Sequence, residues 1–234
     1  MRFPGLLFTF EGIEGCGKTT QMDLAEASLR RTSYEVFRTR EPGGTPVGER
    51  IRSVFLAAEH RFMAPVTELM LVEACRAQLV RERIRPELER GSLVLCDRFT
   101  DATLAYQGYG RGLDLDLIEG LNRLAGDGIE PDRTFLFDCP VEVGLRRMRR
   151  RYQEADDSVI RPGPDRLEAE ERAFHERIRE GYLAIGSKHG GRIRILDTTR
   201  EKERVHLEVM EHVWAAVRER EEQCPLRKSS DRSG

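Results

Sequence analysis

Residues 12–19 carry the strongest chemical signal in the sequence. They spell Gly-Ile-Glu-Gly-Cys-Gly-Lys-Thr and match G-x-x-x-x-G-K-[ST], the pattern of a phosphate-binding loop. Glycines let the backbone N–H groups curl round a β-phosphate, Lys18 adds a point charge, and the Thr19 hydroxyl can reach Mg²⁺. A plain glycine turn is the alternative, but this composition gives such a match by chance only about 0.003 times. The residues expected to contact a nucleoside triphosphate are Gly12, Gly15, Cys16, Gly17, Lys18, Thr19 and Thr20.

The elements around this loop would hold it in place. Residues 6–10 form a short apolar run typical of a buried strand, and residues 19–31 have helical spacing. Further strands are predicted at 34–37, 93–96, 134–137 and 193–196, and helices at 47–57, 66–90, 114–125, 141–152, 168–185 and 200–222. Strands alternating with helices indicate an α/β protein with a parallel sheet covered on both faces. We therefore expect a P-loop NTPase fold with a five-stranded parallel sheet flanked by helices.

Composition narrows the class of protein. The 234 residues are 39% hydrophobic and 34% charged, which fits one globular domain. The net charge of -2 gives no basic excess for a nucleic-acid partner, and no apolar run approaches the roughly 18–20 residues that span a bilayer. The first residues lack a signal-peptide pattern, so we expect a cytoplasmic protein. The five cysteines show no C-x-x-C spacing, so we expect neither a zinc site nor a disulfide framework.

A phosphate loop alone fits a GTPase, a motor, a DNA-dependent ATPase or a small-molecule kinase. Asp97 and Arg98 follow an apolar strand, at the sheet edge where ligands bind in parallel α/β folds. The carboxylate could hold Mg²⁺ or the acceptor, and the guanidinium could hold an anionic oxygen. A surface ion pair is the alternative, because it would give the same two residues in sequence. Residues 40–44, Arg-Glu-Pro-Gly-Gly, end another strand with a rigid turn at the same edge. These features favour a kinase with an anionic acceptor.

Arginines crowd the predicted helix at 141–152. The phosphate loop contains no arginine, so charge that develops during phosphoryl transfer must be met from elsewhere. A mobile arginine is worth ~10³–10⁵ in the rate of related reactions. A solvated basic face is the alternative, but we favour a lid that folds over the triphosphate. The arginines concerned are Arg146, Arg147, Arg149, Arg150, Arg151, Arg161 and Arg166.

Taken together, these segments resemble the thymidylate kinase family, in its bacterial subtype with an arginine-bearing lid. The matching segments are 12–20, 39–44 (T-R-E-P-G-G), 67–69, 76–78, 97–98, 105–112 (A-Y-Q-G-Y-G-R-G), 165–168 (D-R-L-E) and 174–182. They occur in the family's order and cover about residues 5–200. The resemblance implies one kinase domain over residues 1–222, with a lid at about 146–168. Residues 223–234 are predicted to be a disordered tail.

The resemblance implies an activity and roles for individual residues. A member of the family transfers the γ-phosphoryl group of ATP to dTMP, giving dTDP and ADP for dTTP synthesis, with Mg²⁺ and as a homodimer. The implied catalytic residues are Lys18, Glu14, Asp97, Arg98 and a lid arginine among Arg147, Arg150 and Arg151. The implied metal-site residues are Thr19, Asp97, Glu14, Asp165 and Glu168. The implied dTMP-binding residues are Arg40, Glu41, Val72, Arg76, Arg98, Thr103, Tyr106 and Gln107.

The sequence departs from the family pattern at several positions. Val72 stands where the family usually has a phenylalanine that stacks on thymine, Phe99 replaces a usual tyrosine, and Ala102 a usual serine. The lid segment is also longer than usual, so the catalytic lid arginine stays undecided. Because Val72 falls in the expected base pocket, a sister nucleoside monophosphate kinase with altered base preference is the first alternative. A P-loop ATPase switch is the second, and the absent basic excess and the acceptor-type arginines argue against it.

Overall fold

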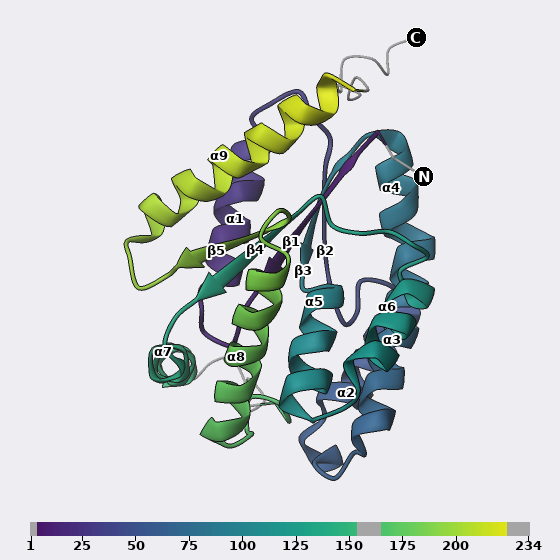
Figure 1. Cartoon of the computed structure of the whole chain (residues 1–234), viewed down its shortest axis with the longest axis vertical. Coiled ribbons are helices and arrows are strands. Elements are labelled where there is room, and N and C mark those ends of the chain that lie inside the picture. The colour runs from purple at the N-terminus through teal and green to yellow at the C-terminus, as the bar shows by residue number, and fades with distance from the viewer. Residues whose placement is uncertain (1–3, 154–164, 224–234) are drawn as a thin grey trace.

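The computed structural model describes residues 4–153 and 165–223 of the chain. Its centre is a five-stranded parallel sheet in the order β2-β3-β1-β4-β5 (Figure 1). The strands are β1 (Leu6–Glu11), β2 (Val36–Arg40), β3 (Leu93–Asp97), β4 (Arg133–Asp138) and β5 (Ile193–Asp197). Phe10 of β1 lies opposite Asp97 of β3 and Phe135 of β4, so these strands end at one edge of the sheet. The predicted fold class is confirmed.

The central strand β1 is buried along its whole length, because helices cover both faces of the sheet. Successive side chains of a strand point to opposite faces, and the core divides accordingly. Phe8 belongs to the larger buried cluster and stacks on Phe135 of β4, with ring centres 6.2 Å apart. Leu7 belongs to a second cluster, with Val94 of β3. The apolar run of β1 therefore fixes the strand that leads into the phosphate loop.

The helices bring distant segments together around the sheet. Helix α9 packs beside α1, and α8 lies in front of the sheet in Figure 1. The helices are α1 (Lys18–Leu29), α2 (Pro46–Leu56), α3 (Pro65–Leu79), α4 (Arg85–Arg90), α5 (Thr100–Thr103), α6 (Leu115–Ala125), α7 (Val141–Gln153), α8 (Arg172–Lys188) and α9 (Lys202–Glu221). Segments of other helix types are the 3₁₀ helix η1 (Ala58–His60) and the π-helices η2 (Val80–Ile84) and η3 (Leu104–Gly110). No helix in these described segments is long and apolar enough to cross a membrane.

Two predicted helices need correction, and one helical stretch was missed. The helix predicted over 66–90 is divided by the wider turns of η2, and Pro86 lies at the start of α4. The helix predicted from 168 begins at Arg172. Residues 100–110, for which no helix was predicted, are helical as α5 and η3. A Cβ at Gly110 would lie 2.9 Å from the ring of Phe174, so the glycine allows α8 to approach η3 closely. Residues 154–164 of the predicted lid and 224–234 of the predicted tail lie outside the described residues.

Candidate active site

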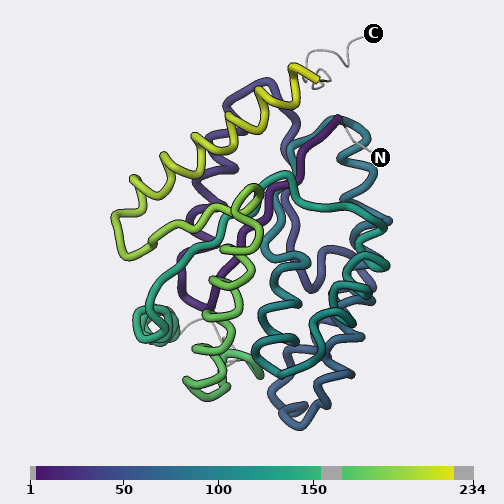
Figure 2. Tube along the Cα trace, in the orientation of Figure 1, coloured from purple at the N-terminus to yellow at the C-terminus, as the bar shows by residue number. Residues whose placement is uncertain are grey.

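A cavity of about 670 Å³ opens at the carboxyl edge of the sheet. The phosphate loop forms one wall through residues 14–21, and the opposite wall comes from the ends of α2, β3, α3 and η3. Helix α7 and residues 165–168 border the same space. The chain trace in Figure 2 shows the turn from β1 to α1 at the end of the sheet where α7 begins. The cavity therefore lies where the strand order places ligands in an open parallel sheet.

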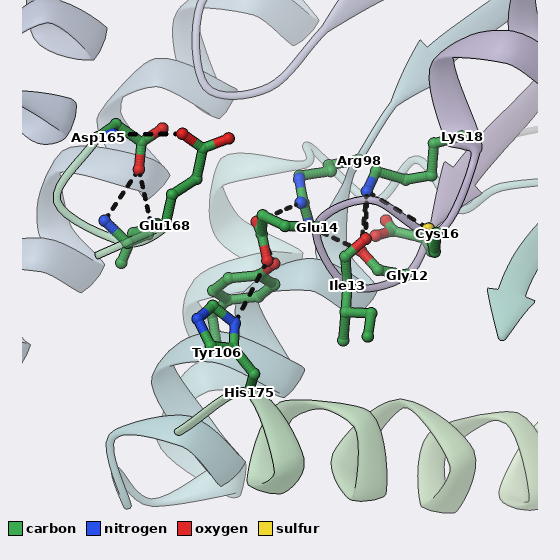
Figure 3. A network of polar contacts seen from close by, with 12 residues as sticks. Gly12, Ile13, Glu14, Cys16, Lys18, Arg98, Tyr106, Asp165, Glu168 and His175 are labelled. Atoms are coloured by element: carbon green, nitrogen blue, oxygen red, sulfur yellow. Dashed lines mark hydrogen bonds and ion pairs between the residues drawn. The ribbon is translucent and has the colours of Figure 1, made fainter. Parts of the chain in front are cut away.

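The phosphate loop has the backbone shape that an anion requires. Gly12, Gly15 and Gly17 have φ values of 135°, 69° and 97°. Residues with a side chain rarely adopt such positive φ values. A Cβ at Gly15 would lie 2.1 Å from the carbonyl oxygen of Gly144, so only glycine fits this approach to α7. Lys18 Nζ donates to the carbonyl oxygen of Gly12 over 2.9 Å (Figure 3). The ammonium group is thus held within the loop.

Arg98 joins this loop to the end of β3. Its Nη2 donates to Oε1 of Glu14 over 2.8 Å, and its Nη1 donates to the Gly12 carbonyl and the Tyr182 hydroxyl, each over 3.2 Å (Figure 3). Burial opposes ionisation of Glu14, but the charge of Arg98 and the neighbouring His175 hold its pKa well below the usual value. Glu14 is therefore an anion next to the phosphate loop. Sequence reasoning missed His175, whose Nδ1 lies 3.6 Å from Oε2 of Glu14.

Several oxygens at the cavity suit a hard cation such as Mg²⁺. Oδ1 of Asp97 and Oε2 of Glu14 are buried without hydrogen-bond partners, and the exposed Thr19 belongs to the cavity wall. Asp165 and Glu168 also line the cavity but lie apart from Glu14 in Figure 3. Within residues 4–153 and 165–223, no three acidic, histidine or cysteine side chains gather as a metal site. Phosphate and water oxygens would therefore complete the shell of an ion bound here.

Arg76 lines the cavity on the side opposite the phosphate loop. The side chain is fully buried, yet it belongs to the cavity lining. It donates to Glu41, Glu73, Thr103 and Asn122 over 2.5–2.9 Å. Burial raises the pKa of Glu41 to about 7, although Arg76 lowers it. The planar guanidinium is thus held in one orientation, as recognition of a carbonyl group requires.

The remaining predicted acceptor residues surround Arg76. Thr103, Tyr106 and Gln107 all contribute to the wall, and the Tyr106 hydroxyl donates to Oε1 of Glu14 over 2.6 Å. Val72 also lines this part of the cavity. Besides Tyr106, the aromatic rings in the described lining of the cavity are Phe55 and Phe99.

Among the predicted acceptor residues, Arg40 lies outside the described cavity lining. Its guanidinium donates to Glu49 over 2.9 Å. Arg52 of α2 lines the cavity instead and donates to the carbonyl oxygen of Pro42 over 2.9 Å. The sequence did contain a signal for Arg52. It lies four residues after the buried Gly48, on the face of α2 that packs inward.

The lid arginines divide between two spaces. Arg147 and Arg151 line the main cavity, whereas Arg146 and Arg150 line a second pocket of about 370 Å³, to which Arg147 also belongs. Arg161 lies outside the described residues. Sequence reasoning also missed the stretch after β5, which reaches the same edge of the sheet. The residues of this stretch that line the main cavity are Thr198, Arg200, Lys202 and Val205.

Comparison with known proteins decides the family. A family model described as thymidylate kinase matches residues 10–209. A thymidylate kinase of Trichlorobacter lovleyi is 52% identical over 194 residues, which cover 83% of this chain and 90% of the relative. One of Geotalea daltonii is 50% identical over 193 residues, covering 82% and 89%. The chain belongs to the thymidylate kinase family. The predicted family and enzyme class are confirmed, so the protein is a nucleoside monophosphate kinase.

A solved structure supports the same assignment. The thymidylate kinase of Ehrlichia chaffeensis is similar with a TM-score of 0.69 and 34% identity, over 90% of this chain and 99% of that chain. The alternative of a P-loop ATPase switch does not account for this agreement over nearly the whole length.

Proposed function

We propose that this thymidylate kinase transfers the γ-phosphoryl group of ATP to dTMP across the cavity described above. This reaction is the activity of the family, and the predicted function is confirmed at that level. One observation carries the assignment of the reaction to this cavity. The phosphate loop and the buried Arg76 line the same cavity, and Arg98, which also lines it, contacts Gly12 and Glu14 of the loop.

The donor side of the cavity would neutralise the charge of the transferred group. Lys18 leaves its loop carbonyls for the β- and γ-phosphates, and the loop N–H groups bind the same oxygens. Arg147 and Arg151 approach from α7, which supplies the charge that a loop without arginine lacks. We propose that the rate of phosphoryl transfer depends on these arginines, as expected for the subtype with an arginine-bearing lid. Arg150 lines the neighbouring pocket, so we assign it a smaller role.

The acceptor side would orient dTMP without a covalent nucleophile. The attacking group is already an anionic phosphate oxygen, so positioning and charge neutralisation suffice. Arg98 would hold this phosphate, with Arg52 in the role predicted for Arg40. Arg76 and Gln107 would face the base, while Tyr106 would press on the sugar. The ring of Tyr106 lies 4.8 Å from the Arg98 guanidinium carbon, which fixes the sugar and phosphate contacts relative to each other.

We propose Mg²⁺ as the cofactor. Asp97 and Thr19 would hold it, since the unpartnered Asp97 oxygen is buried at the cavity and the Thr19 hydroxyl follows the phosphate loop. The ion would supply positive charge between the β- and γ-phosphates of ATP. We assign Glu14, Asp165 and Glu168 to contacts through water.

Two further parts of the proposal concern the assembly and the compartment. We propose a homodimer formed through α2, α3 and α6, of which α3 packs against both others. Their exposed large apolar side chains are Val47, Val54, Val66, Met70, Leu115, Leu117 and Leu124. We also propose that residues 1–222 act as one kinase domain in the cytoplasm. All four described cysteines are free, as is usual in reducing compartments.

An assay with a panel of acceptors tests the proposed function. Purified protein receives ATP, Mg²⁺ and one of dTMP, dUMP, UMP, CMP or AMP, and ADP release is followed by a coupled reaction. We expect the highest kcat/KM for dTMP and an absolute need for the divalent ion. A higher value for another monophosphate would instead support the sister kinase with altered base preference.

A further inference from the structure

Glu68 of α3 is a buried carboxylate that is not part of the cavity lining. It is fully buried and accepts hydrogen bonds from three side chains that belong to two separate segments. Gln107 Nε2 donates to it over 2.7 Å, Arg111 Nε over 3.2 Å and Arg166 Nη1 over 2.6 Å. Gln107 belongs to the acceptor wall of the cavity, whereas Arg166 follows α7 in the chain by more than a dozen residues. One carboxylate thus connects two parts of the site.

Besides its contact with Glu68, Arg166 also packs against the end of α2, which holds it in place. The residue is only 4% exposed, and its Nε donates to the carbonyl oxygen of Phe55 over 3.1 Å. Its guanidinium carbon lies 5.2 Å from the centre of the Phe55 ring, and its backbone N–H donates to Leu56 over 3.2 Å. The adjacent residues Leu167 and Glu168 line the cavity. Arg166 therefore determines where these lining residues lie.

Glu168 extends the connection to the donor side. Its Oε1 accepts from Arg151 Nη2 over 2.8 Å, and its Oε2 accepts from the Tyr152 hydroxyl. Both partners belong to α7, and Arg151 lines the cavity next to the phosphate loop. Arg151 thus contacts Glu168, and Arg166 contacts Glu68, which in turn contacts Gln107. The backbone of residues 166–168 joins these two sets of contacts.

We propose that the Glu68–Arg166 ion pair is a positioning device that couples the two nucleotide sites. Neither residue lines the cavity, but each fixes a neighbour that does. Binding of dTMP at Gln107 would then favour the arrangement of Arg151 that binds ATP, and the reverse holds by thermodynamic reciprocity. This inference rests on the proposed function, because it takes dTMP as the ligand on the Gln107 side. Both members of the pair are desolvated, so removing the Glu68 charge leaves the Arg166 guanidinium buried without this carboxylate. Removing the Arg166 charge leaves Glu68 with Arg111, 3.2 Å away, as a charged partner.

The coupling is measured as a ratio of dissociation constants. Isothermal titration calorimetry gives the Kd of dTMP for the protein alone and for the protein saturated with a non-hydrolysable ATP analogue and Mg²⁺. We expect a tightening of about fivefold or more in the wild-type protein, as is typical of coupled sites. Glu68→Gln and Arg166→Met each bring the ratio close to one, and the double variant adds nothing further because both changes break one contact.

A matched control separates coupling from stability. Arg220 is another buried arginine, and it does not line the cavity. Its Nη2 donates to Oδ1 of Asp132 over 2.5 Å. Arg220→Met is expected to lower the melting temperature as much as Arg166→Met while keeping the wild-type ratio. Arg166→Lys keeps the charge but loses the forked geometry, so we expect an intermediate ratio and a folded protein.

Two outcomes would overturn the inference. One is a wild-type ratio of one, and the other is a folded Glu68→Gln or Arg166→Lys variant that keeps the wild-type ratio. Failure of the proposed function would look different: the wild-type protein would bind both nucleotides and form no dTDP. Calorimetry and the product assay therefore separate the two failures.

Discussion

Nη2 of Arg98 lies 2.8 Å from Oε1 of Glu14, and this ion pair ties the end of β3 to the phosphate loop. Arg98 has a φ of 71°, a left-handed conformation that costs a residue with a side chain roughly 1–2 kcal/mol. A backbone hydrogen bond from its N–H to Phe10 over 3.0 Å holds it there. Strain at such a position indicates that the direction of the side chain matters more than local stability. The strained backbone aims the guanidinium at the loop and at the proposed acceptor phosphate.

Arg98→Lys tests whether the fork of this side chain is needed. A lysine ammonium cannot contact Glu14, Gly12 and Tyr182 from one position, so a phosphate contact is lost. Since a hydrogen bond to a charged group is worth about 1.5–3 kcal/mol, we expect kcat/KM for dTMP to fall roughly 10- to 100-fold. Steady-state assays with Arg90→Lys, an exposed arginine, provide the control. Equal values for both variants would contradict the proposed role.

Lys18→Met tests the phosphate loop itself. Within the described part of the chain, the ammonium donates to the carbonyl oxygens of Gly12 and Ile13 and to Cys16, which are all uncharged, so its loss breaks no ion pair there. We expect the fold to remain and kcat to fall by about 10²–10³, as for other groups that stabilise a transition state. ADP release measures the effect, and Lys188→Met, on the surface of α8, is the matched control. A kcat within a few-fold of the wild type would refute the assignment.

Val72→Phe tests the departure from the family pattern. Stacking of a base on an aromatic ring is worth ~1–3 kcal/mol, and the cavity that Val72 lines has a volume of about 670 Å³. We therefore expect a lower KM for dTMP. Val72→Leu adds bulk without an aromatic face and serves as the control. An unchanged or higher KM in the phenylalanine variant would mean that Phe55 or Phe99 already supplies the stacking contact.

Local patterns in the sequence predicted the fold and the phosphate loop. The apolar runs of β1 and β3 and the loop glycines are contiguous, so their structure follows from neighbours in the chain. Arg40 shows where this reasoning ends, because its salt bridge with Glu49 depends on how α2 is placed against β2. Gly110 likewise lies against Phe174 of α8, a contact between residues far apart in the sequence. Residues set by tertiary packing could not be predicted from spacing alone.

Glu11 predicts a dependence of stability on pH. Burial, and next the charge of Asp101, raises the pKa of Glu11 from 4.5 to about 8. The folded state therefore binds more protons than the unfolded state between these values, and the contribution of Glu11 to stability falls as pH rises through this range. Glu11→Gln keeps an acceptor for the N–H of Phe99 but cannot ionise.

Urea unfolding at two pH values checks this expectation. Relative to the wild type, the free energy of unfolding of Glu11→Gln is expected to rise by on the order of 2 kcal/mol between about pH 6 and about pH 9. Glu59→Gln, at an exposed carboxylate, should show no such change. A constant difference between Glu11→Gln and the wild type across this range would mean that Glu11 does not carry a raised pKa.

The two arginines Arg150 and Arg151 allow a paired test of the lid. They are neighbours on α7, but only Arg151 lines the main cavity, where its guanidinium donates to Glu168 over 2.8 Å. Arginines that meet the charge of a transferred phosphoryl group are worth ~10³–10⁵ in rate, and Arg147 shares this position. We expect Arg151→Ala to lower kcat at least about 10²-fold.

Arg150→Ala is the control, with the same change in charge and a nearly identical place in the helix. We expect its kcat to stay within a few-fold of the wild type, because Arg150 faces the smaller pocket. Single-turnover rates with saturating ATP and dTMP separate an effect on the chemical step from an effect on product release. A larger loss in Arg150→Ala than in Arg151→Ala would reverse the assignment and place the phosphoryl group on the other side of α7.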